Sequence, residues 1–348
     1  MRKMLPVLLT ALLVLSACSA KPSTSTLKVF NWGVYIDDAV IAEFEDKYDA
    51  KVVYDNFESN EAMYTKLQGG EKYDVLVPSD YMIERLIDED KLQKLDFSKI
   101  PNYDGIIESL KGLPSDPTNE YSVPYFWGNV GLLYNTETVD VSDLEEQGWN
   151  ILLNTKYAGK VFIYDSERDA FMIAYKALGY SANSTVEAET EAAYQWLRQL
   201  NNTMDPAYVT DDVIDNMIEG VKDIAVMYSG DAAYIVTENE SMAYFVPSEG
   251  TNLWVDSMVI PSDAKNPDLA HKWINFMLEK EVALMNTVYV GYTTPVQEVF
   301  DEVTGEGGDY EGIEAYIPRV GDEHDETFRY DEDLKRILSD LWTKVKAQ

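Results

Sequence analysis

Cysteine and histidine are nearly absent from this 348-residue chain, which has one cysteine, Cys18, and two histidines, His271 and His324. A single cysteine cannot form an intrachain disulfide, so the stability must come from the hydrophobic core. The two histidines show no metal-ligand spacing, and neither lies in a motif with a Ser or Cys nucleophile. We therefore expect no metal, no cofactor and no enzyme activity.

Two other kinds of site leave weaker signals. Paired carboxylates have no sequence signature, so a glycoside hydrolase among the 62 acidic residues stays open as an alternative. The acidic, glycine-rich stretch 301–312 lacks the order of oxygen ligands of an EF-hand loop. It also has no Lys-Ser/Thr after its glycines, so it does not fit a phosphate-binding loop.

Positive charge is scarce, with 28 Lys and Arg residues against 62 acids and a formal net charge of −34. Such a surface disfavours nucleic acid as a partner. A cationic solute fits it better, because the field of the protein would favour its approach. Many secreted proteins are equally acidic for solubility alone, so the charge is only supporting evidence.

The amino terminus has an apolar run, but a short one. Residues 5–15 follow a basic start and are too few to span a bilayer as a stable anchor. The sequence Leu15-Ser16-Ala17-Cys18 comes next and resembles the lipobox of bacterial lipoproteins. We expect residues 1–17 to be a lipoprotein signal peptide and Cys18 to carry the lipid; an ordinary signal peptide is the alternative.

Cleavage before Cys18 would remove two basic residues and no acid, which changes the net charge from −34 to −36. Residues 18–26 include "KPSTST" and are typical of a short flexible tether. The protein is thus expected outside the cytoplasm, either attached to the cell membrane by its lipid or in the periplasm.

Strand and helix patterns alternate along the chain, which predicts an α/β fold with mostly parallel sheets. The expected strands are 26–32, 51–57, 73–80, 125–135, 159–165 and 223–231, followed by an interrupted extended stretch at 242–261. The expected helices are 37–48, 60–70, 166–179, 187–200, one long helical stretch from Asn266 to Val288, and a last one from Asp331. Ligands of such sheets bind at the carboxyl ends of the strands.

Several stretches together resemble one family. They are "NWGVYIDDAVIAEFE", "ESNEAMYTKL", "YDVLVPSDYMI", "SVPYFWGNVGLLYN", "LGYSANS", "NLWVDSMVIP" and "INFML…VGYTTP". In this order and approximate spacing, they resemble the spermidine/putrescine-binding proteins of bacterial ABC uptake systems. The resemblance runs from about residue 27 to residue 300, and no single stretch would carry it.

The resemblance implies a two-lobed periplasmic-binding-protein-like fold, with a mostly parallel sheet in each lobe and hinge strands that cross between the lobes. The crossings are expected near 125–135 and 253–261. Lobe 1 would then comprise residues 27–133 and 256–299, and lobe 2 residues 134–255 and 300–348.

The resemblance also implies a ligand site at the strand ends, between the lobes. Its expected members are Trp32, Tyr35, Ser79, Tyr81, Ser166, Asp169, Tyr228, Trp254, Asp256 and Tyr292. Trp254 and Asp256 lie two apart in one strand, so they point to the same face. Taken alone, the tryptophans could be core residues, and Ser79 could simply cap a helix.

The stretch "YDSERDAF" departs from the family pattern. Asp169 stands where the family has Glu, and Ser166 stands where one acid can occur. The Ser166–Asp169 spacing also fits a helix-capping box, so capping and ligand binding stay open for Ser166. Arg329 lies close to another family ligand position, where a cation is unexpected.

The expected function is that of a monomeric polyamine-binding lipoprotein of an ABC uptake system. It would capture putrescine or spermidine and deliver it to the permease subunits in the membrane. A binder of another small cationic solute and a polyamine-sensing lipoprotein without a role in transport are the alternatives.

Overall fold

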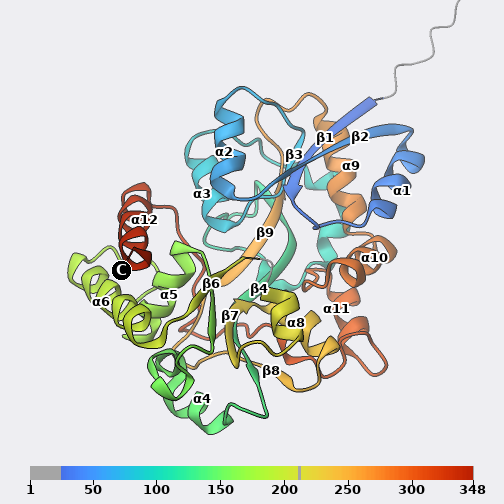
Figure 1. Ribbon diagram of the computed structural model, residues 1–348. Coiled ribbons are helices and arrows are strands. Elements are labelled where there is room, and N and C mark those ends of the chain that lie inside the picture. Colours follow the sequence, from blue (N-terminus) through green and yellow to red (C-terminus); the bar gives the residue numbers. More distant parts are fainter. Residues whose placement is uncertain (1–24, 211–212, 348) are drawn as a thin grey trace, which may run out of the picture.

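The structure is a computed structural model that describes residues 25–210 and 213–347 (Figure 1). The expected signal peptide, Cys18 and the first part of the expected tether lie outside the described residues. Among the described residues, no helix has the length and apolar composition that a membrane crossing requires.

One mixed β-sheet runs through the whole molecule, in the order β2-β1-β3-β9-β4-β7-β5-β6, with β8 paired to β4. Its strands are β1 (Ser25–Trp32), β2 (Ala50–Phe57), β3 (Val75–Leu76), β4 (Ser122–Asn135), β5 (Val161–Tyr164), β6 (Ala207–Val209), β7 (Ile224–Tyr228), β8 (Met242–Phe245) and β9 (Leu253–Val259). At one end β1 pairs in parallel with β2 and β3, and at the other end β5 pairs in parallel with β6 and β7. The expected α/β class, with mostly parallel strands in both halves, is confirmed.

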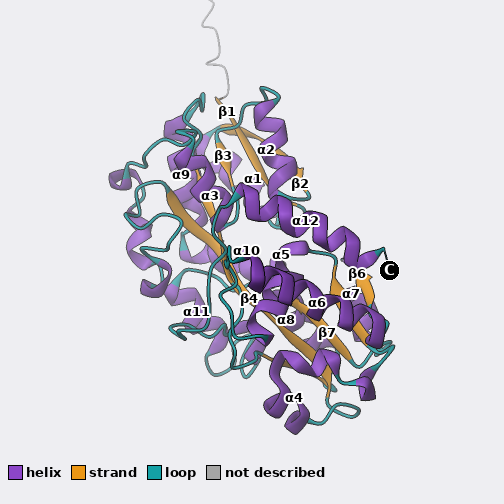
Figure 2. Cartoon of the chain, turned by 90° about the vertical axis from the view of Figure 1, so that its left-hand side faces the viewer, coloured by secondary structure: helices purple, strands orange, loops and turns teal. Residues whose placement is uncertain are grey.

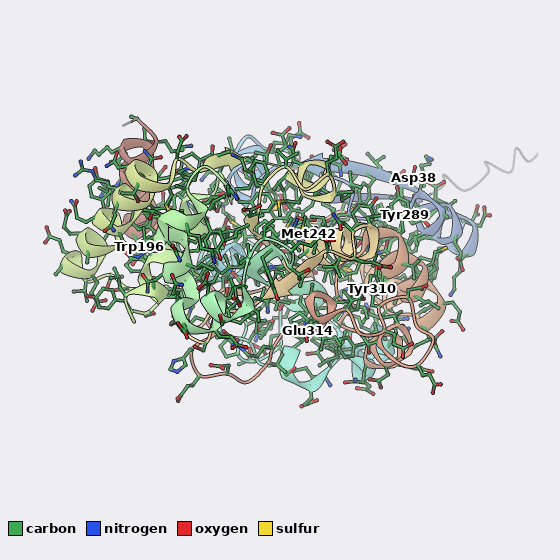
Figure 3. All side chains as sticks on the ribbon, turned by 60° about the horizontal axis from the view of Figure 1, so that its bottom comes forward. Asp38, Trp196, Met242, Tyr289, Tyr310 and Glu314 are labelled. Atoms are coloured by element: carbon green, nitrogen blue, oxygen red, sulfur yellow. The ribbon has the colours of Figure 1, made fainter. Side chains whose placement is uncertain are left out.

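Helices cover this sheet on both sides (Figure 2). They are α1 (Asp38–Tyr48), α2 (Asn60–Gln68), α3 (Asp80–Asp88), α4 (Val141–Gln147), α5 (Glu167–Ala177), α6 (Glu187–Met204), α7 (Val213–Ile218), α8 (Ser229–Glu238), α9 (Pro267–Met277), α10 (Lys280–Val290), α11 (Gln297–Thr304) and α12 (Glu332–Lys346). The molecule is elongated, and Figure 3 places Asp38 of α1 and Trp196 of α6 toward its opposite ends.

The two strands β4 and β9 join the halves. Residues 122–129 of β4 pair antiparallel with β9, and residues 130–135 pair antiparallel with β7 and β8. A register irregularity lies between Pro124 and Phe126. The crossings that the resemblance implied are therefore two adjacent strands of one continuous sheet.

We propose a division of the chain at these strands. Lobe 1 holds β1–β3, α1–α3 and α9–α11, and lobe 2 holds β5–β8, α4–α8 and α12. The expected boundary at residue 300 lies inside α11, whose Val299 and Val303 are both buried. Since α11 packs against α10, the whole helix belongs to lobe 1.

Two local expectations are corrected. The helical stretch after Asn266 is two helices, because Leu278 ends α9 and Glu279 adopts an extended conformation before α10. Ser25 and Thr26, which composition assigns to a tether, begin β1 and pair with Ala50 and Lys51 of β2. Backbone pairing with β2 thus fixes two residues that have a flexible composition.

The hydrophobic residues form two clusters on opposite faces of the sheet. Alternate strand residues point to opposite faces, so Val29 and Met227 belong to one cluster while Phe30 and Val226 belong to the other. Each cluster contains residues of β1 in lobe 1 and of β7 in lobe 2. Both cores therefore extend through the two lobes.

Candidate functional site

The carboxyl ends of the parallel strands meet where the two lobes face each other. Trp32 is the last residue of β1, and Ser79 is the N-cap of α3, in the turn that follows β3. Tyr164 and Tyr228 are the last residues of β5 and β7. The topology therefore places aromatic and hydroxyl side chains at the sheet edge where ligands of α/β proteins bind.

Asp256 is buried at this edge, with 7% of its surface exposed. Ser79 donates a hydrogen bond from Oγ to one carboxylate oxygen of Asp256 (2.6 Å), and the hydroxyl of Tyr35 donates to the other (2.9 Å). Burial raises the pKa of Asp256 to about 6, and the two hydrogen bonds limit this rise. Both donors are neutral, so the carboxylate keeps its negative charge available for a cation.

Tyr35 is held by a turn with an unusual backbone. The preceding residue, Val34, has φ 49°, although a β-branched residue disfavours this left-handed conformation. Val34 itself is 83% exposed. The turn directs Tyr35 inward, where its ring packs edge-to-face on Tyr292 with centroids 5.6 Å apart. The residue in the left-handed conformation thus directly precedes a hydrogen-bond donor to Asp256.

An aromatic wall links the two lobes. The ring of Trp254 lies nearly perpendicular to those of Tyr292 and Tyr228, with centroids 5.4 Å and 6.2 Å away. Two glycines make this packing possible: a Cβ on Gly128 would overlap the Trp254 ring, and one on Gly230 would overlap the Tyr292 ring. Trp254 is 8% exposed, and its Nε1 has no hydrogen-bond partner among the described residues.

Asp169 supplies a second buried carboxylate, from lobe 2. The hydroxyl of Tyr228 donates to its Oδ2 (2.8 Å), whereas its Oδ1 has no partner among the described residues. Burial raises the pKa of Asp169, and hydrogen bonds from Ser166 and Tyr228 oppose this rise. Ser166 is the N-cap of α5 and accepts a hydrogen bond from the backbone N–H of Asp169.

Asp231 is a third carboxylate, which the sequence analysis missed. It lies in the first turn of α8 and accepts hydrogen bonds from the hydroxyls of Tyr164 (2.7 Å) and Tyr292 (2.8 Å). Because Tyr292 belongs to lobe 1, its bond to Asp231 joins the lobes. The stretch "MYSGD" held the signal, since Asp231 follows a strand end just as "PSDY" does.

Three helices begin at this edge, and each has an acid in its first turn: Asp80 in α3, Asp169 in α5 and Asp231 in α8. Helix amino termini carry partial positive charge, which would repel a bound cation. Asp169 and Asp231 offset this charge, whereas burial raises the pKa of Asp80 to about 8, so that Asp80 is mostly protonated and uncharged at pH 7. The edge consequently suits a cationic ligand although three helix dipoles point their positive ends toward it.

Tyr81 has a different environment from the other predicted aromatics. The guanidinium of Arg168, from lobe 2, lies 4.0 Å from the centroid of its ring, so a protein cation already covers one face. The neighbouring Asp80 is 1% exposed, and burial raises its pKa to about 8. Its Oδ2 has no partner among the described residues.

Residues 39–311 match the family described as bacterial extracellular solute-binding protein. The chain belongs to this family. It is 34% identical over 273 residues to the spermidine/putrescine-binding periplasmic protein of Escherichia coli (strain K12), and the match covers 78% of each chain. Membership makes the chain a solute-binding protein and not an enzyme, which leaves the hydrolase alternative without support.

Two solved structures agree with this assignment. A spermidine/putrescine ABC transporter substrate-binding protein from Streptococcus pneumoniae superimposes with a TM-score of 0.80 at 37% identity, over 93% of this chain and 99% of the other. A putative spermidine/putrescine ABC transporter from Listeria monocytogenes gives 0.83 at 36% identity, with the same coverage of both chains. These similarities confirm the periplasmic-binding-protein fold.

In this solute-binding protein, most of the predicted site residues lie together. Tyr35, Ser79 and Asp256 form one hydrogen-bonded group, Asp169 and Tyr228 form a second, and Trp254 and Tyr292 join the two. Trp32 lies at the same sheet edge and packs on Phe57, with ring centroids 4.6 Å apart. The contacts of these residues with a ligand remain predictions.

Among the described residues, no group of three or more His, Cys, Asp or Glu side chains is arranged to hold a metal ion. The three carboxylates of the site lie on separate elements, and each accepts hydrogen bonds from tyrosine or serine hydroxyls. This arrangement of single carboxylates, hydroxyls and aromatic rings suits a flexible organic cation.

Proposed function

We propose that the protein binds a polyamine, putrescine or spermidine, between its lobes. The observation that carries the proposal is Asp256, a buried carboxylate with two neutral hydroxyl donors and Trp254 on the same strand. The names of the relatives from Escherichia coli and Streptococcus pneumoniae support it, since both refer to spermidine and putrescine.

The chemistry of a polyamine matches this set of side chains. Its ammonium groups need carboxylates, hydroxyls and ring faces, and its methylenes need apolar walls. A cation–π contact contributes about 0.5–2 kcal/mol, and a hydrogen bond to a charged group about 1.5–3 kcal/mol. In the proposed complex, Asp256 receives one terminal ammonium, Asp169 and Asp231 receive the other, and Trp254 and Tyr292 enclose the methylenes.

We further propose the place of this binding in transport. Cys18 carries a lipid that holds the protein at the outer surface of the cytoplasmic membrane or in the periplasm. The loaded protein delivers its ligand to the permease subunits of an ABC uptake system. Deletion of the gene would then abolish uptake of radiolabelled polyamine by whole cells, whereas a protein that only senses polyamines would leave uptake unchanged.

Calorimetric titration tests the binding. We expect heat and saturation with putrescine, spermidine or cadaverine, and much weaker binding of butylamine, which has only one ammonium. Failure of all three polyamines would refute the proposal. A thermal-shift panel of other small cations would then identify the ligand, because a tight ligand raises the apparent stability by mass action.

A further inference from the structure

One face of α3 in lobe 1 meets lobe 2, and it begins at the predicted site residue Tyr81. Tyr81, Glu84 and Arg85 lie at positions i, i+3 and i+4, so they share this face. The side chains opposite them come from α5, from the segment before α12 and from Glu332, the first residue of α12. Figure 2 shows α12 on the same side of the molecule as α3 and α5.

The main contact on this face joins Arg329 to Glu84, which is 245 positions away in the sequence. Arg329 Nε donates to both carboxylate oxygens of Glu84 (3.0 Å each), and its Nη2 donates to Oε1. The backbone N–H of Tyr330 adds a bond to Oε2 (2.8 Å). The side chain of Glu84 is 17% exposed, so this carboxylate is both shielded from solvent and held by four donor contacts.

A second contact lies beside the first. Arg85 Nη1 is 3.2 Å from Glu332 Oε2, and the Arg85 guanidinium lies 5.0 Å from the centroid of the Tyr330 ring. Charge alternates across the two pairs: lobe 1 supplies an acid and a base, and lobe 2 supplies the matching base and acid. Both pairs therefore favour the same alignment of α3 with the start of α12.

The lobe 2 segment is fixed to its own lobe. The backbone N–H of Arg329 donates to Asn183 Oδ1 (2.8 Å), and Asn183 Nδ2 donates to the carbonyl of Thr327 (2.9 Å). Glu326 accepts a hydrogen bond from Lys176 of α5 (2.6 Å). Because the segment cannot follow α3 when the lobes separate, opening must break the Arg329–Glu84 contact.

We propose that Glu84, Arg85, Arg329 and Glu332 form an interlobe latch, which stabilises the closed arrangement and slows ligand release without touching the ligand. The latch gives Arg329 a role that differs from ligand binding, and so accounts for a cation near a family ligand position. The inference rests on the proposed function only because its first test measures the release of a bound polyamine.

Stopped-flow displacement of putrescine and spermidine tests the latch. We expect Arg329→Gln and Glu84→Gln each to increase the release rate about threefold to thirtyfold, the range for a bidentate and partly shielded ion pair. The double variant should release ligand no faster than either single variant, because both remove the same contact. Arg336→Gln is the matched control, since within the described part of the chain Arg336 pairs only with Asp333 on its own helix, and it should leave the rate unchanged.

The charge reversal Arg329→Glu should speed release further, and Glu84→Arg combined with it should restore a slow rate. Release rates of Arg329→Gln and Glu84→Gln equal to those of Arg336→Gln would overturn the latch, as would additive effects in the double variant.

Small-angle scattering tests the latch even if the wild-type protein binds neither polyamine, so that the proposed function fails. A larger radius of gyration for Arg329→Glu than for the wild type, without ligand and at low salt, then supports the latch. Equal radii overturn it.

Discussion

Asp256→Asn removes one charge from the site and keeps the shape of the side chain. In the wild type, Ser79 and Tyr35 each donate to one carboxylate oxygen of Asp256. In the variant, one of these two hydroxyls still faces an oxygen acceptor, and the other faces the amide N–H₂ donor of the asparagine. Truncation of one partner of a buried charge pair costs about 2–5 kcal/mol of binding free energy. We therefore expect the affinity for putrescine or spermidine to fall between about 30-fold and several thousandfold.

The same substitution should stabilise the ligand-free protein. The pKa of Asp256 rises from 3.8 to about 6 on folding, chiefly because the group is buried. This rise means that keeping the carboxylate ionised at pH 7 costs about 3 kcal/mol of folding free energy. Rearrangement of one hydroxyl to accept from the new amide offsets part of the gain, so we expect a net increase of about 1–3 kcal/mol.

Titration calorimetry and urea unfolding of both proteins measure the two effects. Asp256→Glu is the control, because it keeps the charge and should retain the pH dependence while changing the reach of the carboxylate. The reasoning is refuted if Asp256→Asn binds polyamines like the wild type. It is also refuted if the variant is less stable than the wild type at pH 7, since burial of the charge would then carry no cost.

Four further predictions concern pH and backbone geometry. Affinity for polyamine should fall by up to about tenfold per pH unit as pH drops below about 6, because Asp256 becomes protonated there. Calorimetry at pH 5 and pH 7.5 measures this change, and equal affinities at the two pH values would contradict it. In the ligand-free protein, Asp256 binds more protons in the folded state than in the unfolded state between pH 3.8 and about 6. Its contribution therefore makes the free energy of unfolding fall as pH rises through that window, and urea unfolding at several pH values would detect this fall. Gly230→Ala should weaken binding at least tenfold by displacing the Tyr292 ring. Gly33→Ala should not weaken it, because a Cβ there would meet no atom of the described residues within 4 Å. Val34→Gly should raise the free energy of unfolding by about 1 kcal/mol through relief of its left-handed conformation, and an unchanged or lower stability would count against strain at this residue.

The sequence was sufficient for the fold class because hydrophobic alternation and helical spacing report burial directly. It also drew attention to Asp256, an acid among apolar neighbours in one strand, which the structure shows to be buried and hydrogen-bonded; its contact with a ligand stays a prediction. The spacing of Trp254 and Asp256 agrees with the structure. Asp256 accepts a hydrogen bond from Tyr35, Trp254 packs on Tyr292, and the rings of Tyr35 and Tyr292 contact each other.

Contacts between distant residues could not be predicted in this way. Asp231 is one acid among 62, and only the tertiary structure shows that hydroxyls from β5 and from the segment after α10 converge on it. Arg329 and Glu84 are 245 positions apart, so no local pattern relates them. The break between α9 and α10 escaped detection because the apolar spacing continues through Leu278 and Glu279 without a proline or glycine.

The continuity of the sheet has a consequence for unfolding. Both hydrophobic clusters contain side chains from the two lobes, and β4 and β9 cross between them. Neither lobe has a separate core, so the loss of either would expose apolar surface of the other. The protein should therefore unfold in urea as one cooperative unit, with coincident transitions by fluorescence and circular dichroism, even though the proposed binding site lies between two lobes.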